Sequence, residues 1–266
     1  MEDETPPSNV SERETRSFPV CDPLRERGCK HCIALFVLEN SGRAQPTLEH
    51  DNATLTFVEL NGRIYGVTCQ HVIDIVQGRN RAAGGHAFDL FTVVEKLVFI
   101  GIERFLQPGD LSGGRAPDIA IRQLHPDYPA AVGKIPISLS QPPESSKIEH
   151  LIAVGYPTAI KQPADDVGRV AIPCIHALAE QVAHSERTVR MFSILAENPG
   201  IDSFSGMSGG PVYWSTPELY GLAGITYEAA PPNEMGVVPD SRISIVAETV
   251  SLDRFSHWVS QVPVLF

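Results

Sequence analysis

Three short segments of the sequence each carry a reactive side chain in a backbone setting that suits nucleophilic catalysis. Ser208 lies in Gly206-Met-Ser-Gly-Gly-Pro211, where glycines on both sides allow positive φ angles and let backbone N–H groups turn inward. His71 ends a β-branched run, and Asp118 comes directly before the run Ile119–Leu124. A serine hydroxyl is a weak nucleophile unless a general base lies within hydrogen-bond reach, and that base needs an acceptor that fixes its tautomer. The pattern therefore predicts Ser208 as a nucleophile, His71 as its base and Asp118 as the acceptor.

Many short strands must bring these side chains together. The runs that indicate strands are continuously apolar or alternate between apolar and polar residues. They are Ile33–Leu38, Ala53–Glu59, Ile64–Thr68, Leu90–Ile102, Ile119–Leu124, Leu151–Val154, Val189–Leu195, Val212–Trp214 and Leu222–Tyr227. Turns rich in glycine and proline separate them, so the pattern favours an all-β barrel or sandwich.

A helical pattern is clear only near the C-terminus, apart from a short turn expected after His71. Within Ser251–Gln261, the apolar side chains that share one helical face are Leu252, Phe255, Trp258 and Val259. Ser251 is suited to cap this helix, and Asp253 lies in its first turn. We expect the helix to pack on the β-structure.

Composition narrows the class of protein further. The chain has 266 residues, of which 42% are hydrophobic, and its longest apolar run, Ile33–Leu38, is too short to span a bilayer. Lys and Arg number 21 against 32 Asp and Glu, and the resulting net charge of −11 repels phosphate backbones. We therefore expect a soluble globular protein with no nucleic acid partner and no membrane partner.

The order and spacing of the three reactive residues resemble those of the trypsin-like (chymotrypsin-fold) serine peptidases. That family has the chain order His, Asp, Ser, whereas nucleophile-elbow hydrolases run Ser, Asp, His and the subtilisin type runs Asp, His, Ser. His71 and Asp118 lie 47 residues apart, and Asp118 and Ser208 lie 90 residues apart, which suits two successive barrels. The resemblance extends to Pro136-Ile-Ser-Leu139 and Leu151-Ile-Ala-Val-Gly-Tyr-Pro157, and it covers roughly residues 30–262.

The resemblance implies an all-β fold of two packed antiparallel β-barrels, chymotrypsin-like, with a C-terminal α-helix. Together with the composition it divides the chain into four parts. These are a disordered N-terminal arm at residues 1–28, a first barrel at 29–130 with His71 and Asp118, a second barrel at 131–250 with Ser208, and a C-terminal helix and tail at 251–266. Residues 1–28 are rich in proline and mixed charge, so they bury too little to offset the entropy of ordering.

The resemblance also implies the chemistry. Ser208 would attack a scissile carbonyl, His71 would carry the proton to the leaving amine, and Asp118 would hold the imidazole. The backbone N–H groups of Gly206 and Ser208 would form the oxyanion hole. The expected activity is that of a serine endopeptidase that acts on a protein or peptide substrate through an acyl-enzyme, with no cofactor and no metal.

The specificity implied by the family rests on two segments. Asp202, six residues before the nucleophile and followed by Ser203, stands where members that cleave after Arg or Lys carry the carboxylate at the floor of the primary pocket. Thr226-Tyr227-Glu228 falls where the family's substrate-pairing strand runs, so Glu228 would add a negative charge near the pocket mouth. These residues predict cleavage after Arg or Lys.

Three positions depart from the secreted members of the family. Met207 stands where those zymogens have the aspartate that receives the new N-terminal amine, so that activation switch is absent. Val72 and Phe204 replace cysteines of two family disulfides. Without a zymogen lock, we expect the activity to be restrained by a regulatory protein partner, by narrow substrate choice or by an unformed pocket.

The cysteines and the N-terminus together predict a cytoplasmic protein. The five cysteines are Cys21, Cys29, Cys32, Cys69 and Cys174, an odd number without framework spacing, which suggests reduced thiols. The first residues also lack the basic start and apolar stretch of a secretory signal. Cys29-Lys-His-Cys32 is compatible with half of a zinc site or with a redox pair, but one CxxC is a weak signal. Cys69 is expected to be a buried small hydrophobic residue.

Two other functions are compatible with the same residues. A protease-fold module could bind a peptide in its cleft without cutting it, although three intact catalytic side chains argue against this. An esterase could use the same acyl-enzyme chemistry, and a comparison of ester and amide turnover would distinguish it from a peptidase.

Overall fold

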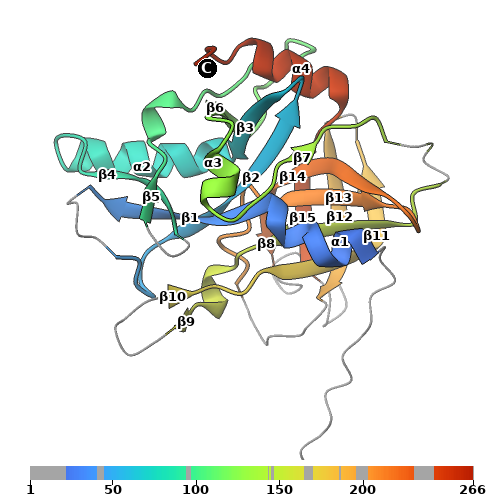
Figure 1. Ribbon diagram of the computed structural model, residues 1–266, viewed down its shortest axis with the longest axis horizontal. Helices are drawn as coiled ribbons and strands as arrows, with labels where there is room; N and C mark the ends of the chain where they lie inside the picture. The colour runs from blue at the N-terminus through green and yellow to red at the C-terminus, as the bar shows by residue number, and fades with distance from the viewer. Residues whose placement is uncertain are drawn as a thin grey trace, which may run out of the picture.

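Two β-sheet units lie side by side in the computed structural model, with helices at the periphery (Figure 1). The structure describes residues 22–40, 45–93, 97–142, 144, 147–164, 170–185, 187–195, 203–230 and 243–265. No helix within these ranges is long and apolar enough to cross a membrane.

The first unit is a seven-stranded sheet in the order β5-β4-β1-β2-β3-β6, with β7 paired to β2. Its strands are β1 (Cys32–Glu39), β2 (Asn52–Leu60), β3 (Arg63–Thr68), β4 (Phe88–Val93), β5 (Leu97–Phe99), β6 (Ala120–Leu124) and β7 (Ile137–Ser138). The hairpin between β2 and β3 turns at Asn61 and Gly62, whose positive φ angles of 53° and 72° match the twist of the flanking strands.

The second unit is a closed six-stranded barrel in the order β11-β12-β15-β14-β13-β8. Its strands are β8 (His150–Gly155), β11 (Ile175–His184), β12 (Thr188–Leu195), β13 (Pro211–Ser215), β14 (Tyr220–Ala230) and β15 (Ile243–Thr249). The short strands β9 (Gln162–Pro163) and β10 (Val170–Ala171) form a separate hairpin. The sequence pattern missed β11 and β15, two of the six barrel strands.

The predicted all-β, chymotrypsin-like fold is confirmed, and its first half has two further features. The described first unit is an open sheet, because β5 pairs only with β4 and the outer edge of β6 meets only the isolated bridge between Leu106 and Ile121. In addition, β7 runs parallel to β2, with Val58 opposite Ile137. The first unit therefore extends past the predicted boundary at residue 130.

Seven helical segments join the strands along the described parts of the chain. They are α1 (Asp22–Arg27), η1 (Gly28–His31), α2 (Gln70–Ala82), η2 (Ile102–Arg104), α3 (Tyr128–Ala131), η4 (Thr158–Ile160) and α4 (Leu252–Ser260). The predicted C-terminal helix is confirmed as α4: Ser251 Oγ accepts the Arg254 backbone N–H at 3.2 Å, and Phe255 and Trp258 are fully buried. The short turn predicted after His71 is instead the 13-residue helix α2.

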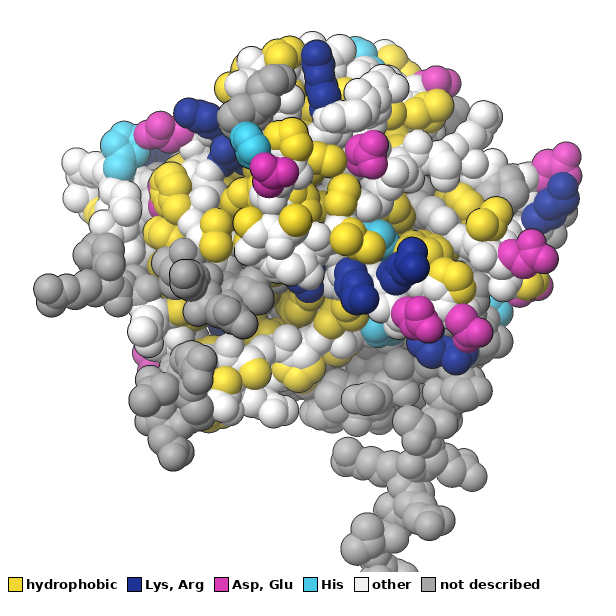
Figure 2. Space-filling view, viewed as in Figure 1, with side chains coloured by type: hydrophobic (Ala, Val, Ile, Leu, Met, Phe, Trp, Pro, Cys, Tyr) yellow, Lys and Arg dark blue, Asp and Glu magenta, His cyan; other side chains and the backbone are white. Residues whose placement is uncertain are grey.

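The end of the predicted N-terminal arm is ordered, which corrects the sequence interpretation for residues 22–28. Helix α1 forms there because Leu24 is fully buried and therefore anchors it, while charged residues face outward. Figure 2 shows acidic and basic side chains side by side over this helix, where Arg25 pairs with Asp22 at 3.3 Å. The rest of the predicted arm, residues 1–21, lies outside the described residues.

A disulfide corrects the prediction of reduced thiols. Cys29, in η1, is bonded to Cys174, just before β11, and joins the N-terminal segment to the barrel. Cys32 and Cys69 are free and buried, as expected for Cys69. The two cysteines of the CxxC segment are therefore not paired with each other, because Cys32 points into the core while Cys29 meets the second unit.

One hydrophobic core joins the two units. The largest buried cluster contains side chains of both sheets as well as Leu24 of α1 and Phe255 and Trp258 of α4. The C-terminal helix also contacts the first sheet, where the rings of Tyr65 and Phe255 meet edge to face with centroids 5.9 Å apart. This shared core fixes the relative position of the residues that the two units contribute to the site.

Candidate active site

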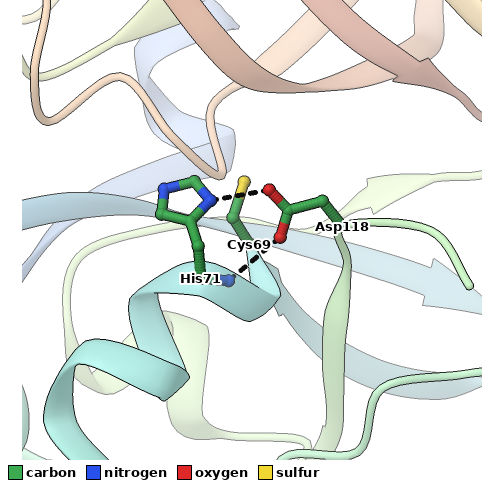
Figure 3. Close-up of side chains that lie close together, drawn as sticks. All are labelled: Cys69, His71 and Asp118. Atoms are coloured by element: carbon green, nitrogen blue, oxygen red, sulfur yellow. Dashed lines mark hydrogen bonds and ion pairs between the residues drawn. The ribbon is translucent and has the colours of Figure 1, made fainter. Parts of the chain in front are cut away.

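The structure brings His71, Asp118 and Ser208 into one hydrogen-bonded chain. His71 Nδ1 lies 2.6 Å from Asp118 Oδ2, and His71 Nε2 lies 3.0 Å from Ser208 Oγ. The backbone N–H of His71 also donates to Asp118 Oδ1 at 2.9 Å, so the carboxylate is held at both oxygens (Figure 3). His71 stands in the first turn of α2, Asp118 just before β6, and Ser208 in the loop before β13. The first unit therefore supplies the histidine and the aspartate, and the second unit supplies the serine.

The hydrogen bonds set the charge of Asp118. Burial alone would raise the pKa of this carboxyl, but the bonds from the side chain and backbone of His71 outweigh it, and the pKa lies below its ordinary value. Asp118 is therefore ionised at neutral pH. With Nδ1–H donating to this carboxylate, the lone pair of Nε2 faces the hydroxyl of Ser208.

Glu248, which the sequence reasoning missed, supports Asp118 from the second unit. Glu248 Oε1 accepts the backbone N–H of Asp118 at 3.2 Å, and the side chain is 7% exposed. Burial raises the pKa of Glu248, against the opposing effects of that hydrogen bond and of Arg187 and Arg254. The only available signal was an acidic residue next to apolar residues near the end of β15, a strand that the sequence pattern does not indicate.

Strand β2 of the first sheet holds the loop that carries Ser208. Thr54 and Thr56 lie two residues apart, so they project to the same face of the strand. Thr54 Oγ1 donates to the Gly206 carbonyl at 2.8 Å, and Thr56 Oγ1 donates to the Gly209 carbonyl at 2.7 Å. The Thr54 backbone N–H donates to the Ser208 carbonyl at 2.8 Å. The nucleophile loop of one unit is thus fixed by a strand of the other.

Glycine is required at two positions of this loop. Gly206 has φ +100°, and a Cβ there would lie 2.5 Å from the carbonyl oxygen of Tyr156. Gly209 has φ +89°, and a Cβ there would overlap the Thr54 carbonyl oxygen. A side chain at either position would therefore move the backbone on both sides of Ser208.

Two backbone N–H groups of the loop have no backbone acceptor in the part of the chain that the structure describes. The Ser205 carbonyl accepts the Thr158 N–H at 2.6 Å, and the Met207 carbonyl accepts the Gly210 N–H at 2.8 Å. Because the N–H of a trans peptide points opposite to its carbonyl, the N–H groups of Gly206 and Ser208 face the other way. Neither has a backbone acceptor within the described ranges. The oxyanion hole at Gly206 and Ser208 stays a prediction, and the directions of these two N–H groups are compatible with it.

Comparison with known proteins agrees with this geometry. The family model described as Trypsin matches residues 67–245, more than half of the chain, and this span contains His71, Asp118 and Ser208. The chain belongs to the trypsin family. This serine endopeptidase family was the one indicated by the order and spacing of the three residues.

Solved structures similar to this trypsin-family chain have low sequence identity. A thermostable serine protease from an extremophilic microorganism is 12% identical, with a TM-score of 0.45, over 88% of this chain and 97% of that chain. The serine protease of a human pathogenic astrovirus is 15% identical, with a TM-score of 0.37, over 83% of this chain and 91% of that chain. No curated protein matches the sequence.

A cavity of about 790 Å³ adjoins the site of this trypsin-family protein. Its ionisable lining residues are His71, Asp74, Arg115, Asp118, Arg187, Glu228 and Glu248. Tyr227 also lines it, so two of the predicted substrate-binding residues, Tyr227 and Glu228, lie beside the catalytic side chains. Carboxylates outnumber guanidinium groups in this lining.

The other predicted substrate-binding residues are placed differently. Thr226 is fully buried, its backbone N–H donates to the Gly210 carbonyl, and its carbonyl accepts the Gly209 N–H. Its backbone is therefore engaged inside the protein. Ser203 is exposed at the start of the nucleophile loop. Asp202 lies outside the described residues, so the structure does not place the predicted pocket acid.

The departures from the secreted trypsin-family pattern are all buried and apolar. Met207 is fully buried and packs against Gly155. A Cβ atom added at Gly155 would lie 3.2 Å from the Met207 Cα atom. Val72 and Phe204 are 5% and 3% exposed. Packing thus replaces an ion pair at one position and disulfides at the other two.

Proposed function

We propose that this protein hydrolyses peptide bonds through an acyl-enzyme formed on Ser208. The observation that carries the proposal is the position of His71, whose two ring nitrogens meet Asp118 and Ser208 at 2.6 and 3.0 Å. Serine becomes nucleophilic when such a base accepts its proton, and Asp118 stabilises the imidazolium that forms.

The proposed reaction proceeds in two halves. Ser208 Oγ attacks the scissile carbonyl while its proton passes to His71 Nε2, and the carbonyl oxygen becomes an oxyanion held by the Gly206 and Ser208 N–H groups. The proton then moves from His71 to the leaving amine, which departs as the acyl-enzyme forms. Water enters, gives a proton to His71 and releases the acid product, and Ser208 recovers its proton.

We propose that the substrate carries Arg or Lys before the cleaved bond. The support is the sequence position of Asp202, the carboxylate of Glu228 in the cavity beside His71, and the net charge of −11. Glu228 is exposed, and a carboxylate beside the cleaved bond attracts a basic side chain in preference to a neutral one.

A fluorogenic peptide library varied at the residue before the cleaved bond tests both proposals. We expect cleavage after Arg and Lys by the wild type and none by Ser208→Ala. Asp202→Asn should reduce kcat/KM for basic peptides far more than for neutral ones, and Glu228→Gln should have a smaller effect of the same sign. Cleavage after other residues would support the peptidase activity and contradict the preference for Arg and Lys.

A binding module and an esterase are the competing functions. A binding module does not need a serine, a histidine and an aspartate in one hydrogen-bonded chain. Ester turnover that persists when amide turnover is absent would identify an esterase, so each library peptide is paired with its ester.

Regulation and location remain parts of the proposal. We propose restraint by a protein partner or by narrow substrate choice, because the buried Met207 offers no carboxylate for a zymogen switch. The cytoplasmic location rests on the replacement of two family disulfides by Val72 and Phe204, and the Cys29–Cys174 bond opposes it. Alkylation of free thiols in intact cells, followed by mass spectrometry, decides whether that bond exists there.

A further inference from the structure

Cys69 places a third metal-ligating atom beside the catalytic pair. Its Sγ, a ring nitrogen of His71 and a carboxylate oxygen of Asp118 all lie within 4.8 Å of one another. Figure 3 shows the sulfur at the junction between the imidazole and the carboxylate. The proposed mechanism does not use this thiol, which is fully buried and donates to the Thr226 carbonyl at 3.1 Å.

The three atoms form a ligand set for a thiophilic divalent cation. Thiolate, imidazole and carboxylate are the usual ligands of Zn²⁺, at about 2.3, 2.0–2.1 and 2.0–2.2 Å respectively. Ligand atoms in a tetrahedral zinc site are therefore about 3.3–3.7 Å apart. The three atoms reach this spacing if the close His71–Asp118 contact opens and the sulfur moves inward by at most about 1.5 Å.

The site can be reached from solvent on one side. The side chains of His71 and Asp118 are 40% and 29% exposed, and both line the cavity beside the site. A hydrated cation in that cavity would meet the imidazole and the carboxylate first and the thiol behind them. Water from the cavity can fill the fourth position, which is the arrangement of an open zinc site.

We propose that Cys69, His71 and Asp118 form an inhibitory site for Zn²⁺. On binding, the thiol loses its proton to solvent and becomes the thiolate ligand, and its negative charge and that of Asp118 balance the two positive charges of the ion. No oxidation or reduction occurs, so removal of the metal by a chelator restores the free side chains.

Inhibition follows from the tautomer of His71 and rests on the proposed function. In the free site Nδ1 carries the proton and Nε2 accepts the hydrogen bond of Ser208. A metal on Nδ1 leaves a neutral imidazole only if the proton sits on Nε2. Nε2–H has no lone pair for the Ser208 proton, so the general base is lost while the serine stays in place.

The test compares variants of Cys69 with a matched control. Cys69→Ala removes the ligand and Cys69→Ser keeps a donor for the Thr226 carbonyl. Cys32→Ala alters the other cysteine that is free and buried among the residues the structure describes. Peptide hydrolysis is measured against Zn²⁺ concentration without thiol reductants, and each protein is referred to its own metal-free rate. We expect chelator-reversible inhibition of the wild type and of Cys32→Ala, and a half-inhibitory concentration at least about 10-fold higher in the Cys69 variants.

A second readout does not depend on catalysis. Titration with Cd²⁺ should give the ultraviolet charge-transfer band of a cadmium–thiolate bond in the wild type and in Cys32→Ala, and no such band in the Cys69 variants. A protein without peptidase activity but with this band would overturn the proposed function and leave the site intact. Equal zinc inhibition in the wild type and the Cys69 variants, or no Cys69-dependent band, overturns the metal site.

Discussion

Removal of the Cys29–Cys174 disulfide should lower the stability of the fold by a large amount. The bond closes a loop of 145 residues, from the N-terminal segment to the barrel. In the chain-entropy treatment, a loop of that length removes about 17 cal/mol/K from the unfolded chain, or about 5 kcal/mol at 25 °C. Unfolding entropy of about 2.1 cal/mol/K per residue gives roughly 0.56 kcal/mol/K for this chain, so Tm should fall by about 9 °C.

Thermal unfolding followed by circular dichroism measures this effect. The oxidised wild type is compared with the wild type in a dithiol reductant and with the double variant Cys29→Ser/Cys174→Ser, each with and without reductant. We expect the reduced wild type and the double variant to melt together, about 9 °C below the oxidised protein. Reductant should leave the double variant unchanged. Titration of the unfolded, oxidised wild type should find two fewer thiols than its five cysteines.

Two results would refute this reasoning. A double variant that melts with the oxidised wild type would mean that the bond does not constrain the unfolded chain. Five reactive thiols in the oxidised protein would mean that the bond is absent.

Three further predictions concern the loop, the site and the last helix. Gly206→Ala should reduce kcat by roughly the 10²–10³-fold expected for loss of one oxyanion donor. Gly62 also has a positive φ, but a Cβ there would meet no atom within 4 Å, so Gly62→Ala should leave kcat unchanged. Equal effects of the two substitutions on kcat would contradict the predicted steric clash at Gly206. Glu248→Gln should raise the urea midpoint at pH 7, because burial raises the pKa of this carboxyl and the protonated form is favoured in the fold. The stabilising contribution of protonated Glu248 is present below the ordinary pKa of 4.5 and is lost as the pH rises through the higher pKa of the folded protein. A difference in urea midpoint between variant and wild type that persists below pH 4.5 would contradict this reasoning. Ser251→Ala removes the acceptor of the Arg254 N–H and should cost about 1 kcal/mol in urea unfolding, with no loss of activity.

Local sequence patterns were sufficient to predict the elements whose signals lie within a few residues. The helix α4 followed from a capping serine and four apolar residues on one face. The cap is present and Phe255 and Trp258 are buried, whereas Leu252 is exposed. The nucleophile loop followed from glycines whose positive φ angles the structure requires at Gly206 and Gly209. The order and spacing of His71, Asp118 and Ser208 indicated which residues would meet, because a family pattern supplied the topology.

Long-range contacts could not be predicted in the same way. Strands β11 and β15 have few consecutive apolar residues, and each pairs with two neighbouring strands of the closed barrel. The pairing of Cys29 with Cys174 depends on the docking of η1 on the second unit, where the Tyr213 hydroxyl donates to the Gly28 carbonyl at 2.8 Å. Glu248 reaches Asp118 across 130 residues of sequence for the same reason.

Coupling between the two units holds the site where two disulfides of the secreted pattern are replaced. The threonines Thr54 and Thr56 of the first sheet hold the loop of the second, and a buried cluster continues through both. Disulfides at Val72 and Phe204 are not needed where packing and hydrogen bonds fix the same backbone.

Covalent labelling of Ser208 tests the central claim most directly. A serine-reactive phosphonate probe is incubated with the wild type, with His71→Ala and with Ser208→Ala, and the labelled residue is located by mass spectrometry. We predict one label on the wild type, on Ser208, with labelling strongly slowed in His71→Ala and absent in Ser208→Ala, because only a serine activated by its base reacts rapidly. An unlabelled wild type, or a label on another residue that persists in Ser208→Ala, would contradict the account.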